Sequence, residues 1–202
     1  MRIVGGRYRG RRLLAPAGEA VRPTSDRARE ALFNILSHGH FAADGIPFAG
    51  ATVLDAFAGT GALGLEALSR GAAEAVFIEK DPEAVAVLRR NVASLGESAH
   101  AEIVPGDATR PPRARLSCRV TFIDPPYRSG LSAAALEALD RSGWFAPEAL
   151  AVVELGAREE FVPPAGFTLL DERVYGAARL VFLRCDATLG SKLDTPISGA
   201  SR

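Results

Sequence analysis

The stretch Thr52-Val53-Leu54-Asp55-Ala56-Phe57-Ala58-Gly59-Thr60-Gly61 decides the fold of this 202-residue chain. Its first four residues, 52–55, have the apolar character of a buried parallel strand. The glycines that follow predict a tight loop, which opens a helix over about residues 61–70. A strand, a glycine loop and a helix in this order are typical of an open α/β sheet, in which ligands bind at the carboxyl ends of the strands. We therefore expect a ligand site at this loop.

The same alternation continues along the chain. Apolar runs predict further strands, and helical spacing of apolar residues predicts the helices between them. Thr24 or Ser25 is expected to cap the first helix, and Asp81 to cap a helix that ends at Gly96. The remaining predicted strands are 75–79, 101–104, 120–124, 149–154, 167–175 and 178–184, and another helix is predicted at about 131–141. The expected fold class is α/β, with a Rossmann-like, seven-stranded, mostly parallel sheet that ends in an antiparallel hairpin.

Length and composition limit the number of domains and the class of protein. A chain of this length suits one compact domain, and no apolar run approaches the ~20 residues of a membrane span. The basic N-terminus lacks the apolar core of a secretory signal. Cys118 and Cys185 are far apart and are expected to be free thiols in a reducing cytoplasm. The three histidines form no metal-like pattern with them, so we expect no metal. We also expect a cytoplasmic, monomeric protein with no membrane contact.

Charge is balanced overall but uneven along the chain. The 24 basic and 24 acidic residues give no net charge, yet residues 1–30 hold eight arginines against three acids. We expect residues 1–23 to form an exposed, basic β-hairpin or arm, residues 24–186 the main domain, and residues 187–202 a disordered tail. Arginine binds phosphates bidentately and stacks on bases, although a solvated surface in a GC-rich genome would look the same. The candidate RNA-binding residues are Arg7, Arg9, Arg11, Arg12, Arg22 and Arg27.

Acidic residues stand at the ends of four successive predicted strands. Asp55 heads the glycine loop, where a carboxylate suits a cationic amine. Glu79 can accept hydrogen bonds from two ribose hydroxyls, as in sites for NAD or for S-adenosylmethionine. Asp107 is placed for an adenine amine, and Asp124 follows the fourth strand. Residues 59–64 match the GxGxxG dinucleotide fingerprint, but an acid at the head of the loop disfavours a pyrophosphate.

The sequence Asp124-Pro125-Pro126-Tyr127 follows the apolar run 120–123. The two prolines stop the strand, because neither can donate a ladder hydrogen bond, and they hold Asp124 in an extended conformation. One carboxylate, neighbouring carbonyl groups and an aromatic ring then form a rigid platform. Such a platform can accept hydrogen bonds from the exocyclic amine of a nucleobase while the ring stacks on the base.

With these residues assembled, the chain resembles class I S-adenosylmethionine-dependent methyltransferases. Within them it is similar, over about residues 1–185, to the RsmD family of bacterial 16S rRNA guanine-N2 methyltransferases. The glycine loop and the platform are shared by many amino-group methyltransferases, whereas the N-terminal blocks narrow the family. These blocks are Arg2-Ile3-Val4-Gly5-Gly6, Arg9-Gly10-Arg11, Arg22-Pro23-Thr24, Asp26-Arg27, Arg29-Glu30 and Leu32-Phe33-Asn34.

The resemblance implies a cofactor, a partner and a set of site residues. S-adenosyl-L-methionine would be converted to S-adenosyl-L-homocysteine, and the substrate would be 16S rRNA in an assembled or assembling small ribosomal subunit. Asp124, Pro125, Pro126 and Tyr127 would be catalytic, with Asp124 and the Pro125 carbonyl accepting from the amine and Tyr127 stacking on the extruded base. The residues implied for the cofactor are Thr24, Asp55, Phe57, Ala58, Gly59, Thr60, Gly61, Glu79, Lys80, Asp107, Ala108 and Asp124.

Two alternatives stay open at this stage. The platform also occurs in adenine-N6 DNA methyltransferases, which usually carry a target-recognition domain for which this chain has no room. The second alternative is a non-catalytic rRNA-binding assembly factor with a vestigial cofactor pocket. Binding of the cofactor without methyl transfer would favour this second alternative.

Overall fold

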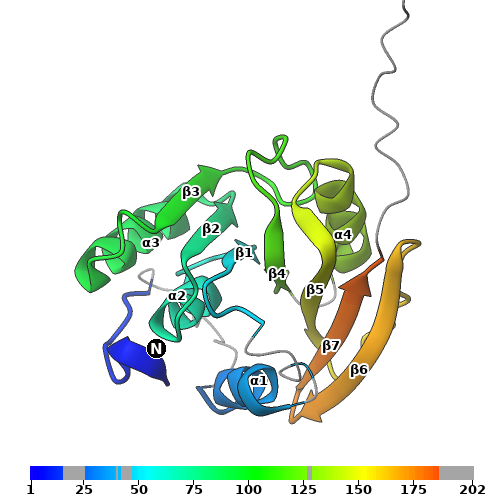
Figure 1. The fold of residues 1–202 in the computed structure, drawn as a ribbon, viewed down its shortest axis with the longest axis horizontal. Coiled ribbons are helices and arrows are strands. Elements are labelled where there is room, and N and C mark those ends of the chain that lie inside the picture. Colours follow the sequence, from blue (N-terminus) through cyan, green and yellow to red (C-terminus); the bar gives the residue numbers. More distant parts are fainter. Residues whose placement is uncertain (16–25, 40, 42–46, 127–128, 187–202) are drawn as a thin grey trace, which may run out of the picture.

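Seven strands form one sheet in the computed structural model of the protein, which describes residues 1–15, 26–39, 41, 47–126 and 129–186 (Figure 1). The strand order is β3-β2-β1-β4-β5-β7-β6, and the first five strands of that order run parallel. The order reverses at β1 and β4, which is where open α/β sheets bind ligands. The strands are β1 (Thr52–Ala56), β2 (Glu74–Glu79), β3 (Ala101–Pro105), β4 (Cys118–Ile123), β5 (Phe145–Gly156), β6 (Phe167–Tyr175) and β7 (Ala178–Cys185).

Helices cover both faces of the sheet. The helices are α1 (Asp26–His38), α2 (Ala62–Ser69), α3 (Pro82–Leu95) and α4 (Leu131–Arg141). Apolar residues of α1, α2 and α3 pack with one face of the strands, including Phe77 and Phe122. Apolar residues of α4 pack with the other face, which includes Ile78 and Ile123. The parallel strands are therefore buried on both sides, as their near-continuous apolar runs predict.

The predicted fold class is confirmed, with small shifts at the ends of elements. Asp81 caps α3, because its Oδ1 accepts a 2.8 Å hydrogen bond from the Glu83 N–H, and Gly96 ends that helix with a left-handed φ of 76°. Strand β5 begins four residues earlier than predicted. Strand β4 ends at Ile123, which leaves Asp124 outside the ladder. The predicted cap at Thr24 or Ser25 and the predicted tail lie outside the described residues.

The N-terminal segment, residues 1–15, has the antiparallel pairing of the predicted hairpin, but it is docked on the main domain instead of forming a free arm. It contains one antiparallel bridge, between Arg2 and Arg12, and a short 3₁₀ helix, η1 (Gly6–Tyr8). Ile3 is 0% exposed and Leu13 is 5% exposed, and both belong to the core that α1, α2 and α3 share. Burying these two side chains stabilises the docked segment, so its arrangement depends on the main domain.

Buried acids on the main domain hold this segment in place. Glu66 and Glu97 are 0% and 1% exposed. Oε2 of Glu66 accepts a 2.8 Å hydrogen bond from the Val4 N–H, and Oε1 of Glu97 accepts from the Tyr8 hydroxyl at 2.5 Å. The hydrogen bond to Glu97 is the main cause that raises the pKa of Tyr8. The N-terminal segment thus supplies a partner for one oxygen of each buried carboxylate, while the other oxygens contact Arg70 and His100. Losing these partners would leave buried acceptors unpaired, which favours the docked position.

Candidate active site

Four side chains lie at one level along the carboxyl edge of the sheet. Ala56 pairs with Ile78 and with Ile123, and Ile123 pairs with Val153. The residues one position further along these four strands therefore also lie side by side across the sheet. These positions are Phe57 after β1, Glu79 on β2, Asp124 after β4 and Glu154 on β5. The structure thus brings together two of the acids that the sequence placed at strand ends.

The glycine loop between β1 and α2 is held from several sides. Phe57, which is half-buried, has a left-handed φ of 63°, a conformation that side-chain-bearing residues rarely adopt. Gly61 precedes α2 with a φ of 82°. The Ala58 N–H donates to the Ile78 carbonyl at 3.0 Å, and the Gly61 N–H donates to the Ala58 carbonyl at 2.7 Å. Strain concentrated in one well-bonded loop is characteristic of a ligand site.

Asp55 supports this loop from inside the protein. It is 2% exposed, and its Oδ2 accepts a 2.8 Å hydrogen bond from the Gly64 N–H in the first turn of α2. Burial, partly offset by that hydrogen bond, raises the pKa of Asp55 to about 7, and the nearby Glu79 carboxylate adds to the rise. Because Asp55 already accepts this helix N–H, the GxGxxG sequence does not leave that group for a pyrophosphate. A buried carboxyl group in this position is better placed to hold the loop than to bind an ammonium group directly.

Glu79 connects the glycine loop to the end of β2. Its Oε2 accepts from the Gly59 N–H at 2.7 Å, and its Oε1 accepts from the Asp81 N–H at 2.8 Å. A carboxylate has about four acceptor positions, so two hydrogen bonds to the backbone leave capacity for a diol. The side chain is half-buried. Glu79 can therefore hold the loop and accept hydrogen bonds from a ligand at the same time.

Asp107 lies after β3 in a short turn. Its Oδ1 accepts from both the N–H and the hydroxyl of Thr109, each at 2.8 Å. These hydrogen bonds, more than the charge of nearby Lys80, lower the pKa of Asp107. Ala108 is 2% exposed and packs in the core that contains α4, whereas Lys80 is exposed. Asp107 is therefore an ionised acceptor at this edge, and Ala108 serves mainly to pack the turn.

The proline platform follows β4 directly. Asp124 is half-buried, Pro125 is buried and Pro126 is exposed. The Pro126 carbonyl accepts a 3.2 Å hydrogen bond from the Ser129 N–H, shortly before α4 begins. Tyr127 lies outside the described residues. Among the described members, the platform presents a carboxylate beside the glycine loop, at the level of Glu79.

Thr60 contacts the N-terminal segment. It is 5% exposed, and its hydroxyl lies 3.9 Å from the sulfur of Met1. Its carbonyl accepts a 3.0 Å hydrogen bond from Nδ2 of Asn91, a fully buried residue of α3. The Asn91 side chain also accepts from the Leu14 N–H at 2.8 Å and donates to the Leu14 carbonyl at 3.2 Å. The interpretation of Thr60 as a cofactor contact thus missed its role in joining the loop to the N-terminus.

Two buried polar residues near the candidate site escaped the sequence reasoning. Glu154 is 4% exposed and lies on β5 at the level of Asp124, and its position at the end of a predicted strand was the available signal. Asn91 interrupts the apolar face of α3, and a buried amide on such a face indicates a specific hydrogen-bonding role. Each occupies a position that the pattern assigns to the buried face of its element, so periodicity alone could not single it out.

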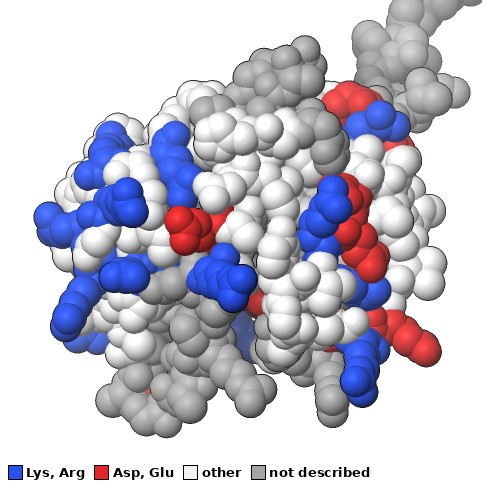
Figure 2. Space-filling model, turned by 90° about the horizontal axis from the view of Figure 1, so that it is seen from below, with Lys and Arg blue, Asp and Glu red and all other residues white. Residues whose placement is uncertain are grey.

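The predicted RNA-binding arginines divide into two groups. Arg7 pairs with the buried Glu97, and Arg11 donates to the Ser94 carbonyl at 2.8 Å, so both help to dock the N-terminal segment. Arg9, Arg12 and Arg27 are exposed, as are the side chains of Arg7 and Arg11 despite these contacts, while Arg22 lies outside the described residues. Figure 2 shows lysine and arginine gathered on the side where the N-terminal segment and α3 lie. This side of the molecule carries a positively charged surface.

The structure also bears on the two cysteines and on the expected absence of a membrane span and of a metal site. Cys118 and Cys185 are free and buried, and burial is the main cause that raises the pKa of both thiols to about 12. Within the described ranges, no helix is long and apolar enough to cross a bilayer. In the same ranges, no group of three or more histidine, cysteine or acidic side chains is arranged to hold a metal ion.

Comparisons with known proteins agree with this geometry. The family described as Conserved hypothetical protein 95 matches residues 1–184. The Ribosomal RNA small subunit methyltransferase D of Escherichia coli (strain K12) is 41% identical over 179 residues, which cover 87% of this chain and 85% of the relative. The structure of a putative methyltransferase from Escherichia coli has a TM-score of 0.78 at 38% identity, covering 93% of this chain and 98% of that one.

A more distant structure shares the fold. It is an RNA methyltransferase from Salinibacter ruber in complex with S-adenosyl-L-homocysteine, with a TM-score of 0.56 at 17% identity, and it covers 87% of this chain and 99% of its own. The family match spans nearly all of the described residues, including the glycine loop and the proline platform. The chain therefore belongs to the Conserved hypothetical protein 95 family, that is, to the RsmD family of methyltransferases.

Proposed function

We propose that this protein transfers a methyl group from S-adenosyl-L-methionine to the exocyclic N2 amine of a guanine in small-subunit rRNA. The observation that carries the proposal is the position of Asp124 and the proline platform, at the level of Glu79 and directly beside the glycine loop. A cofactor held by the loop and by Glu79 would end close to an acceptor amine held at Asp124. The names of the relatives, which are rRNA methyltransferases, support the same substrate class.

The residues present fit S-adenosyl-L-methionine. Glu79 keeps acceptor capacity for both ribose hydroxyls, and the ionised Asp107 can accept from the adenine amine. Gly59, which has no side chain, lets a ligand approach the loop backbone closely. When bound, the cofactor supplies an activated methyl group on a sulfonium centre. The partly protonated Asp55 holds the loop and can add negative charge near that cation.

The platform residues would act on the acceptor amine. The lone pair of a guanine N2 is delocalised into the ring, so this nitrogen is a poor nucleophile. Asp124 and the Pro125 carbonyl would accept the two N–H groups, favour a pyramidal nitrogen and direct its lone pair toward the methyl group. Asp124 could also take the proton that the nitrogen loses as the new bond forms. Most of the acceleration would come from this positioning.

The basic side of the molecule would bind the rRNA backbone. Exposed arginines of the N-terminal segment, such as Arg9 and Arg12, lie on the same segment that contacts Thr60 of the glycine loop. Phosphate contacts orient a nucleic acid without reading its sequence. The N-terminal segment would therefore position the RNA relative to the cofactor loop.

Methyl transfer from labelled S-adenosyl-L-methionine tests the proposal. The substrates are small ribosomal subunits from a bacterium that lacks this enzyme, naked 16S rRNA and duplex DNA. We expect label in the subunits or the naked rRNA, recovered after digestion as N2-methylguanosine. Label in adenine of the DNA would instead identify an adenine-N6 enzyme. Binding of S-adenosyl-L-methionine with no transfer to any substrate would identify a non-catalytic factor.

A further inference from the structure

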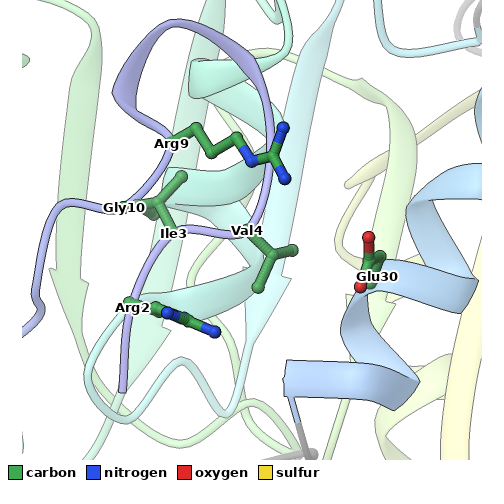
Figure 3. Close-up of a pocket in the computed structure, with 6 residues that line it drawn as sticks. All are labelled: Arg2, Ile3, Val4, Arg9, Gly10 and Glu30. Atoms are coloured by element: carbon green, nitrogen blue, oxygen red, sulfur yellow. The ribbon is translucent and has the colours of Figure 1, made fainter.

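A separate cleft lies between the N-terminal segment and α1 (Figure 3). Its volume is about 150 Å³. The residues that line it are Arg2, Ile3, Val4, Arg9, Gly10 and Glu30. Figure 3 shows Arg2 and Arg9 at different heights on the N-terminal segment, with Glu30 facing the segment from α1. The cleft therefore offers two cations on one wall and one carboxylate on the other.

Hydrogen bonds fix both walls of this cleft. Arg29, which is 1% exposed, donates from α1 to the Arg2 carbonyl, so the two walls are tied together next to the cleft. The Val4 N–H is held by Glu66, and the Gly10 N–H donates to the Ile3 carbonyl at 2.9 Å. The backbone that carries Arg2 and Arg9 is thus rigid. A ligand would not have to order the walls, which lowers the entropic cost of binding.

The size and charge of the cleft restrict its ligand. Pockets for whole drug-sized ligands are larger, at about 300–1,000 Å³. A phosphate group with the adjoining sugar edge fits this space. Two guanidinium groups suit the phosphate, and a carboxylate opposite them suits a hydroxyl donor rather than a second anion.

We propose that this cleft binds one ribonucleotide of the substrate RNA, outside the candidate active site. Arg2 and Arg9 bind its phosphate, and Glu30 accepts a hydrogen bond from its ribose 2′-hydroxyl, the group that distinguishes RNA from DNA. The inference rests on the proposed function, because it supplies a contact for the same RNA. It adds a role for Glu30 that simple charge attraction cannot supply, since an acid would otherwise repel the RNA backbone.

Substitutions at Glu30 distinguish a hydrogen bond to the RNA from simple repulsion of its backbone, because the two predict opposite changes in RNA affinity. Glu30→Ala and Glu30→Gln remove the same negative charge, but only Gln keeps a hydrogen-bond acceptor. We expect Glu30→Ala to weaken binding of unmethylated small subunits about tenfold, the scale for a hydrogen bond to a charged group, with Glu30→Gln losing less. If Glu30 only repels the RNA, both variants bind more tightly, and that result overturns the proposal.

Arginine variants provide the matched control. Arg2→Gln, Arg9→Gln and Arg12→Gln each remove one positive charge from the same segment, but Arg12 does not line the cleft. We expect about tenfold weaker subunit binding for Arg2→Gln and Arg9→Gln, and about twofold for Arg12→Gln. Equal losses for Arg9→Gln and Arg12→Gln would overturn the cleft as a site.

Parallel assays distinguish the inference from the proposed function. Wild-type methyl transfer to the three substrates is measured beside each titration, and thermal unfolding checks that the variants are folded. If the wild type methylates rRNA and Glu30→Ala binds subunits more tightly, only the cleft proposal fails. If the wild type binds S-adenosyl-L-methionine but neither binds subunits nor methylates any substrate, the proposed function fails and the cleft proposal fails with it.

Discussion

The Gly59 N–H donates a 2.7 Å hydrogen bond to Oε2 of Glu79, so the end of β2 holds the glycine loop that follows β1. The same carboxylate accepts from the Asp81 N–H at the start of α3. One side chain therefore fixes two backbone segments around the expected cofactor. Its substitution should affect cofactor binding through the lost contact to the ligand and through the released loop.

Glu79→Ala should weaken binding of S-adenosyl-L-methionine. A lost hydrogen-bonding partner with a full charge costs about 1.5–3 kcal/mol, which corresponds to roughly 10- to 150-fold in the dissociation constant. Calorimetric titration measures this change directly. Glu83→Ala is the control, because Glu83 is an exposed acid nearby on α3. An unchanged affinity in Glu79→Ala would remove Glu79 from the cofactor site.

Asp124→Asn should reduce turnover and leave cofactor affinity nearly unchanged. The substitution removes a charged acceptor that faces the amine in the proposed mechanism, and general acid–base groups supply about 10²–10⁴-fold in rate. Single-turnover methylation of small subunits gives the rate, and calorimetry gives the affinity. Glu137→Gln, an exposed change on α4, serves as the matched control. Wild-type turnover in Asp124→Asn would contradict the assignment.

Asp55 should make stability depend on pH. Burial raises its pKa from an ordinary 3.8 to about 7, so between these values the folded protein holds a proton that the unfolded chain has lost. The free energy of unfolding should therefore fall as pH rises from about 4 to 7, by at most about 1.4 kcal/mol per pH unit. Asp55→Asn, which can keep the hydrogen bond to Gly64, should flatten this slope. Denaturant titrations at pH 5, 6, 7 and 8 compare the two proteins, and parallel curves would refute the raised pKa.

Gly64→Ala should destabilise the protein. A Cβ at this position would lie 2.3 Å from the Phe77 ring and 3.2 Å from the Asp55 Cβ, because α2 approaches the sheet closely there. Overpacking of this kind costs about 1–3 kcal/mol, or about 2–12 °C in Tm for a domain of this size. Gly106→Ala is the control, since nothing lies within 4 Å of its added Cβ. Calorimetric scans that give equal Tm values for the two variants would contradict the close approach.

Arg7→Gln should lower stability, a role for Arg7 that the sequence did not suggest. The variant loses the ion pair with Glu97, a carboxylate that is 1% exposed. Because the Arg7 side chain is itself half exposed, we expect a loss of only about 1 kcal/mol, or about 2–4 °C in Tm. Arg9→Gln should leave Tm unchanged. Thermal unfolding of both variants tests whether Arg7 helps to dock the N-terminal segment and Arg9 does not.

Local patterns determined the sheet, its helices and the order of the acids along its edge. Apolar runs marked each strand, and the carboxyl ends of parallel strands must meet at one edge, so Glu79 and Asp124 could be placed together from the sequence. The Asp81 cap and the Gly96 stop were equally local, because each depends on residues within a few positions. These features need no knowledge of distant contacts.

Only the tertiary structure decided where the polar side chains point. Val4 is 62 residues from Glu66 and Leu14 is 77 residues from Asn91, and no periodicity predicts a hydrogen bond over such a separation. These bonds changed the N-terminal segment from an expected free arm into a docked element beside Thr60. Asp55 likewise turned inward, because a buried helix N–H had to be satisfied. The sequence thus predicted where the candidate site lies, and long-range hydrogen bonding within the folded core assigned these polar groups their partners.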